Sequence, residues 1–79
     1  MKPRLIKGAR AGLGYKQSFM AEQLDMSIES YRKKEGGSGR FSFEQKLKLA
    51  RILKMPFDNM NDILFDGKLP TPDSWNAQL

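Results

Sequence analysis

Apolar residues follow helical spacing in five short stretches of the chain. Side chains three or four positions apart share one face of a helix, and the chain shows neither an alternating strand pattern nor an internal repeat. The predicted helices run from residue 3 to a stop at Gly12 and Gly14, over residues 16–24 and 28–35, from 43 to the break at Pro56, and over residues 57–65. We therefore predict an all-α fold, a bundle of five helices around one core, followed by a C-terminal tail from residue 67 to residue 79.

Capping residues and glycines mark where several of these helices begin and end. Ser27 is a good N-cap, because its hydroxyl oxygen can accept a backbone N–H from the first turn of the next helix. Ser42 opens an S-x-x-Q capping box with Gln45. Gly36-Gly37 and Asp66-Gly67 are typical helix stops, since glycine adopts the left-handed conformation that ends helices.

The turn over Asp25-Met26-Ser27 joins the second and third predicted helices without a glycine or a proline. Met26 is its one apolar residue, and we predict that it fills the angle between the two helices. In the fourth helix, apolar residues spaced three apart form a stripe, and two more widen it. These residues are Leu47, Ala50 and Leu53, with Phe43 and Leu49.

Length and composition favour one small intracellular domain without a metal or cofactor. The 79 residues suit a single domain, and the absence of cysteine and histidine excludes disulfides and Cys/His zinc sites. No stretch approaches the ~20 apolar residues of a membrane span, and no signal peptide is evident. We expect a cytoplasmic, nucleoid-associated protein. It is not expected to be an enzyme, because no phosphate loop or nucleophile motif is present.

The positive charge is concentrated in the first two thirds of the chain. The formal net charge is +5, and residues 1–54 carry 13 of the 14 basic side chains but five of the nine acidic ones, a local balance of +8. A basic domain is typical of proteins that bind a polyanion, most often nucleic acid. A solvated surface rich in lysine has the same composition, so charge alone leaves both readings open.

From Leu5 to Leu64 the chain resembles the Cro/repressor-type (XRE-type) helix-turn-helix domains of phage repressors. The resemblance covers about three quarters of the chain and implies a DNA-binding domain over residues 1–66. Its matching positions are Arg10, Gln17, Ala21, Leu24, Ser27, Glu35, Gly37, Phe43, Leu47, Leu49, Ala50, Leu53 and Met55.

In that family the third helix enters the major groove and the second crosses the DNA backbone. The resemblance implies that Gln17 donates to a phosphate. Ile28 would make only an apolar contact, and Glu29 would either accept from a cytosine amino group or merely support the first turn of its helix. Arg32 and Lys33 would reach a base or a phosphate. The full set of expected DNA-binding residues is Lys16, Gln17, Ser27, Ile28, Glu29, Ser30, Arg32, Lys33 and Arg40.

The resemblance also implies a buried or half-buried ion pair between Arg10 and Glu35, which would orient the third helix against the first. Two departures from the family pattern concern its inward positions. Tyr31 and Lys34 stand where aliphatic residues are usual, and Lys34 would have to lay its stem along the core. Phe19 stands where a polar residue is usual, so it either marks a protein partner surface or packs under the first helix.

The expected function is that of a prokaryotic or phage transcriptional regulator that binds operator DNA as a homodimer, because two half-sites about one DNA turn apart are usual for such domains. The expected dimer surface comprises Phe57, Met60, Leu64 and Trp75. The alternative is an antirepressor-like module that binds a phage repressor or another regulatory protein, a role that Phe19, Ile28 and Glu29 suit better than they suit DNA binding.

Overall fold

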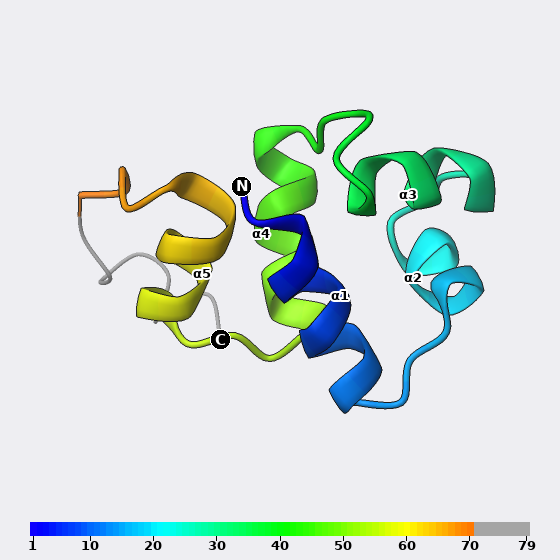
Figure 1. The fold of residues 1–79 in the computed structure, drawn as a ribbon, viewed down its shortest axis with the longest axis horizontal. Coiled ribbons are helices and arrows are strands. Elements are labelled where there is room, and N and C mark those ends of the chain that lie inside the picture. Colours follow the sequence, from blue (N-terminus) through cyan, green and yellow to red (C-terminus); the bar gives the residue numbers. More distant parts are fainter. Residues whose placement is uncertain (71–79) are drawn as a thin grey trace.

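The computed structural model describes residues 1–70, which form five α-helices and no strand (Figure 1). The helices are α1 (Pro3–Gly12), α2 (Gln17–Gln23), α3 (Ile28–Glu35), α4 (Phe43–Ile52) and α5 (Phe57–Phe65). The predicted all-α fold is confirmed, and each predicted helix is present with its ends displaced by a few residues at most. In Figure 1, α5 lies on one side of α4 and α1, and α2 and α3 lie on the other.

The two predicted N-caps are present. The Ser27 hydroxyl accepts the backbone N–H of Ser30 at 3.1 Å and begins α3. At the start of α4, Ser42 and Gln45 exchange the two bonds of a capping box, at 3.1 Å and 2.9 Å. Each cap satisfies backbone donors that the first turn of a helix leaves without a partner. The N-terminal ends of α3 and α4 are therefore set by local sequence.

The turn between α2 and α3 is tight because α2 ends in a Schellman motif. The Met26 N–H donates to the Ala21 carbonyl at 3.0 Å, and the Asp25 N–H donates to the Glu22 carbonyl at 3.1 Å. This motif requires a left-handed residue, which here is Asp25 with φ 55°. Aspartate tolerates that conformation better than most residues do, which explains a sharp turn without glycine. Met26 is half-buried and packs against the core, in agreement with the prediction.

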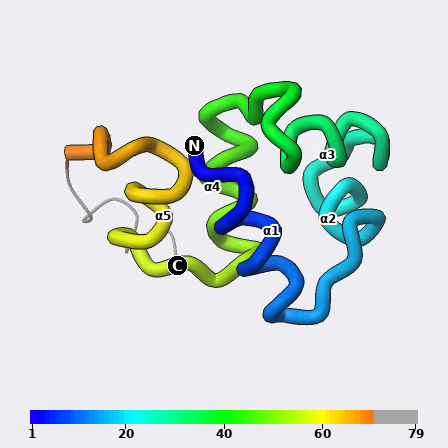
Figure 2. The backbone as a smooth tube through the Cα atoms, in the orientation of Figure 1, coloured from blue at the N-terminus to red at the C-terminus, as the bar shows by residue number. Residues whose placement is uncertain are grey.

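The smooth tube in Figure 2 shows how this turn places α3 next to α2, at the far side of the molecule from α5. After α3 the chain reverses through Gly37, whose φ of 91° favours glycine. A β-carbon at Gly37 would lie 3.3 Å from the Cγ of Pro3, so the loop after α3 passes close to the start of α1. The first and third helices are thus held together at this end.

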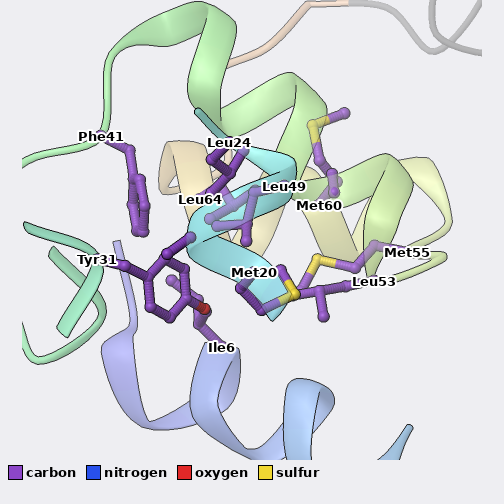
Figure 3. Close-up of a cluster of buried hydrophobic side chains, with 12 residues drawn as sticks. Ile6, Met20, Leu24, Tyr31, Phe41, Leu49, Leu53, Met55, Met60 and Leu64 are labelled. Carbon is purple, nitrogen blue, oxygen red and sulfur yellow. The ribbon is translucent and has the colours of Figure 1, made fainter. Parts of the chain in front are cut away.

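One core draws side chains from all five helices (Figure 3). The apolar residues buried in it are Ile6, Met20, Ala21, Leu24, Tyr31, Phe41, Leu49, Ala50, Leu53, Met55, Met60 and Leu64. The only buried charged side chain among the described residues is that of Glu35. Tyr31 and Phe41 pack with their ring centroids 6.0 Å apart, so the aromatic at position 31 fills the space in which the family resemblance implies an aliphatic residue.

The structure corrects the expected dimer surface on α5. Met60 and Leu64 are completely buried in the core of the single chain, so neither is available to a partner. Phe57 is half-buried against the same core, and Trp75 lies outside the described residues. The prediction for Met60 and Leu64 was wrong because the apolar side of α5 packs inward, onto the other helices of its own chain.

The predicted stripe of α4 is also partly wrong. Leu49, Ala50 and Leu53 are buried, and Leu47 is half-buried, but Phe43 is 58% exposed. The Phe43 ring contacts the half-buried ring of Phe65 from α5, with centroids 5.4 Å apart. Phe43 sits at the first position of α4, where the helix has not yet come under the other helices, so its ring covers an edge of the core.

Candidate functional site

The carboxylate of Glu35, near the end of α3, is the centre of a buried polar network. Arg10 of α1 holds it in a bidentate ion pair, from Nε to Oε2 at 2.8 Å and from Nη2 to Oε1 at 3.2 Å. The Tyr31 hydroxyl donates to Oε2, and the Gln17 amide donates to Oε1 at 3.1 Å. The expected Arg10–Glu35 ion pair is therefore present and joins α1 to α3, and Gln17 connects α2 to the same carboxylate.

The network sets the ionisation of its members. Burial alone would raise the pKa of Glu35, but the hydrogen bonds from Arg10, Tyr31 and Gln17 outweigh it and lower that pKa. The hydrogen bond to Glu35 raises the pKa of Arg10 against the opposing effect of burial. Burial, with the neighbouring Glu35 carboxylate, raises the pKa of Tyr31. At neutral pH the site thus holds a carboxylate, a guanidinium and a neutral phenol.

Arg10 makes one further bond that fixes the start of α2. Its Nη1 donates to the Tyr15 carbonyl at 2.8 Å, in the loop between α1 and α2. The Arg10 side chain is 12% exposed and the Glu35 side chain 3% exposed, so the pair is largely shielded from bulk water. A buried pair adds little net stability, but it is costly to break because the remaining charge loses its partner. Its role here is to hold α1, α2 and α3 in one arrangement.

Gln17 connects this buried network to an exposed cation. The Gln17 amide donates to Glu35 and its carbonyl oxygen Oε1 accepts from the Nε of Arg32 at 3.2 Å. Arg32 lies on α3 and is exposed. Gln17 was expected to contact a DNA phosphate, and this bridge between Glu35 and Arg32 was not predicted. No pattern in the sequence indicates it, because the three residues come from two helices and meet only in the folded chain.

Arg32 and Gln17 line a shallow hollow between α1, α2 and α3. Two further cations, Arg4 and Lys7 of α1, border the same hollow, and both are exposed. Neither Arg4 nor Lys7 was among the DNA-binding residues expected from the sequence. Their spacing of three positions puts them on one side of that helix, but which helix they face is decided by the packing of α1 on α3.

The start of α3 combines exposed and partly buried side chains. Ser27 and Glu29 are exposed there, as are Arg32 and Lys33 in the last turn of the helix. Ile28 was expected to face outward, but it is half-buried and packs against the core, so only part of its side chain is accessible. Ser30 is half-buried, and its backbone N–H is used by the Ser27 cap. The accessible side chains at this end of α3 are therefore mainly polar.

Arg40 does not join Arg32 at the hollow beside α1. It lines a second hollow together with Lys46, Lys68 and the N-terminal residue Met1, next to Asp66. The N-terminal ammonium is paired with Asp66 at 2.9 Å, and this bond lowers the pKa of that carboxyl. Arg32 and Arg40 thus line different hollows. Lys16, which is exposed at the N-cap of α2, lines neither of them.

Lys34 and Phe19, which like Tyr31 depart from the residue types usual in the family, also find partners within the chain. Lys34 is half-buried, and its Nζ donates to the Gln45 side chain at 3.4 Å, which ties α3 to the start of α4. Phe19 remains 38% exposed and packs its ring on Tyr15, with centroids 4.8 Å apart. Phe19 therefore lies on the outside of α2 rather than under α1.

Comparisons with known proteins do not assign this chain to a class, so its function has to be inferred from the site. No family model, curated protein or solved structure matches the chain. Within residues 1–70, no group of three or more Asp and Glu side chains is placed to hold a metal ion. The helices of the same region are too short and too polar for any of them to cross a bilayer.

Proposed function

We propose that the protein is a sequence-specific DNA-binding transcriptional regulator whose α3 enters the major groove. The observation that carries this proposal is the group of exposed cations formed by Arg32 and Lys33 on α3 and Arg4 and Lys7 on α1. Three of these four, Arg4, Lys7 and Arg32, surround one hollow. Such a cluster favours a polyanion, and the region that carries it has the strong positive balance noted above.

The shape of the α2–α3 unit also supports this function. α3 is a short helix at the edge of the molecule, joined to α2 by a tight turn (Figure 1). A helix with its side chains is ~10–12 Å wide and fits the ~12 Å major groove of B-DNA. The exposed residues of α3, Glu29, Arg32 and Lys33, would then face the DNA, and the cations of α1 would lie against a phosphate strand beside the groove.

The proposal includes binding as a homodimer on two half-sites, since one short helix in one groove supplies limited affinity. Because Met60 and Leu64 are buried within the chain, this dimer would use other surface residues than the ones expected from sequence. Sedimentation of the protein with and without a duplex tests this part of the proposal. A single protein bound per duplex at saturation would overturn it.

The first experiment measures binding to a non-specific duplex at two salt concentrations. Wild type is compared with the double variant Arg32→Ala/Lys33→Ala and with the matched control Lys48→Ala/Lys54→Ala, which removes two exposed cations from α4 and its end. Each lost phosphate contact should lower the slope of log K against log salt by about 0.9. We expect a weaker affinity and a shallower slope for the α3 variant alone.

Two results would count against the proposal. Equal losses in both double variants would show that only net charge matters. The absence of any duplex binding by wild type at low salt would favour the second candidate function, an antirepressor-like module that binds a regulatory protein. The observation in favour of that candidate is that Phe19, an aromatic residue, is 38% exposed on α2, while Glu29 on α3 would be repelled by DNA phosphates.

A further inference from the structure

We propose that Gln17 is a positioning residue, which holds Arg32 so that the outer end of its guanidinium meets a DNA phosphate over the hollow bordered by Arg4 and Lys7. This inference rests on the proposed function and goes beyond it by assigning separate roles to two residues. Arg32 would contact the ligand, and Gln17 would act only through Arg32. The hollow and the two hydrogen bonds of the Gln17 amide carry the argument.

The direction of the Gln17 amide is fixed by the chemistry of Glu35. The Glu35 pKa is lowered, so its carboxylate is ionised at neutral pH and can only accept hydrogen bonds. The Gln17 NH2 group must therefore face Glu35, and the carbonyl oxygen must face the other way. That oxygen lies 3.2 Å from the Nε of Arg32. The carboxylate in turn is held by Arg10 and Tyr31, so the orientation is transmitted from the core.

As a consequence, the guanidinium of Arg32 is held at its Nε, and its Nη atoms remain available to bind a ligand. A guanidinium carries five N–H donors in a rigid plane, and the bond to Gln17 uses the one on Nε. The four on the two Nη atoms remain, and those that point away from Nε form the outer edge of the group. Fixing an exposed arginine in this way removes rotamer freedom before binding, and less entropy is then lost when the ligand arrives.

The neighbours of Arg32 favour a phosphate as the ligand rather than a base. Arg4 and Lys7 border the same hollow from α1. Together with Arg32 they create an electrostatic field that attracts an anion whatever the base sequence of the DNA. A phosphate presents oxygens to which an arginine can donate two parallel bonds. The same geometry supports a positioning role for Gln17, because its carbonyl oxygen accepts from Arg32 and one of its two amide N–H groups donates to Glu35.

The test is a double-mutant cycle on duplex binding. Gln17→Met keeps the length of the side chain and removes both hydrogen bonds, and Arg32→Lys keeps the charge but removes the Nε donor. In the wild-type background, Gln17→Met should weaken binding roughly 2- to 10-fold, as expected for the loss of one net hydrogen bond. In the Arg32→Lys background, Gln17→Met should have less than about a twofold effect, because no positioned donor is left.

The Arg32→Lys background also separates positioning from stability. Gln17→Met removes a bond to Glu35 in both backgrounds, so an effect that acts through the folding of the α1–α3 contact would persist when Arg32 is lysine. The control is the pair Gln17→Met and Lys33→Ala, whose effects should add because Lys33 is exposed on α3 and does not share the hollow. Thermal unfolding of each variant confirms that the compared proteins are folded.

A second readout does not involve DNA. In NMR spectra of the free protein, the Arg32 Nε–H should exchange with solvent more slowly in wild type than in Gln17→Met, and more slowly than the Nε–H of Arg4. Equal exchange rates would overturn the positioning role even if DNA binds. This measurement keeps the inference testable when a variant binds too weakly for the cycle.

The outcomes distinguish this inference from the proposed function. Duplex binding with additive effects of Gln17→Met and Arg32→Lys overturns the inference and leaves the function standing. A loss confined to one DNA sequence overturns the assignment of Arg32 to a phosphate, because phosphate contacts weaken all duplexes alike. If wild type binds no duplex, both proposals fail, whatever the exchange rate of the Nε–H.

Discussion

Removing the guanidinium of Arg10 should strongly destabilise the fold, and more so at neutral than at acidic pH. The variant is Arg10→Met, which keeps the apolar stem and removes both bonds to Glu35 and the bond to the Tyr15 carbonyl. Glu35 would remain a 3% exposed carboxylate without its counter-ion. Loss of one partner of a buried pair typically costs ~3–5 kcal/mol.

We expect the lower end of that range, about 3 kcal/mol, because Tyr31 and Gln17 still donate to the orphaned carboxylate. A domain of this size has a total stability of roughly 4–12 kcal/mol, so the loss is a large share. Urea unfolding followed by far-UV circular dichroism is the assay. With a slope of about 1 kcal/mol per molar urea, the midpoint at pH 7 should fall by about 3 M.

The pH dependence provides an internal check on the mechanism. In wild type the pKa of Glu35 is lowered, so its contribution to stability is present above its ordinary pKa of about 4.3 and is lost as the pH falls through the folded value. In Arg10→Met, burial dominates and the pKa should be raised instead. The variant then gains stability as the pH falls through that raised pKa, and the difference from wild type narrows between pH 7 and about pH 4.

The matched control is Arg4→Met, which removes an exposed guanidinium from the same helix and should change the free energy of unfolding by less than about 0.5 kcal/mol. The reasoning is refuted if both methionine variants lose the same stability. It is also refuted if the gap between Arg10→Met and wild type is unchanged at acidic pH, because the cost would then come from lost packing and not from an uncompensated carboxylate.

Three further changes test other parts of the structure. Met60→Ala should cost ~2–5 kcal/mol of unfolding free energy, whereas Phe43→Ala should cost clearly less because that ring is 58% exposed; equal midpoint shifts in urea would contradict the observed core. Gly37→Ala should cost at least about 1 kcal/mol, since φ is 91° and the new β-carbon would lie 3.3 Å from Pro3, and an unchanged melting temperature would argue against this loop geometry. Ser27→Ala should lose about 1 kcal/mol through the missing cap of α3, which Ser27→Asp should largely restore in the same melting experiment.

Helix positions were accessible from the sequence because they depend on neighbouring residues. The Ser27 cap and the capping box of Ser42 act over three residues, and the left-handed stop at Gly37 is local as well. The Arg10–Glu35 pair was expected from the family resemblance, not from spacing, since 25 positions separate the two residues. These elements suffice for an all-α fold, but they leave open how the helices face one another.

Which residues of a helix are buried, and which segment covers them, depends on packing between parts of the chain that are distant in sequence. Sequence assigned Met60 and Leu64 to a dimer surface and Phe43 to the core, and the structure reverses both. An apolar stripe shows that a helix side must be covered, but the covering helix can belong to the same chain or to a partner. Only the position of α5 against the rest of the chain decides between them.

The sequence by itself therefore determined the five helices, the side-chain caps of α3 and α4, and the positive charge of the region that forms them. The tertiary structure decided which cations share a hollow and what the Gln17 amide does. Its two hydrogen bonds reach Glu35 and Arg32, 18 and 15 positions away. Such contacts depend on how α2 packs against α3 and cannot be read from the local spacing of residues, because a change in the angle between the helices would separate the same three side chains.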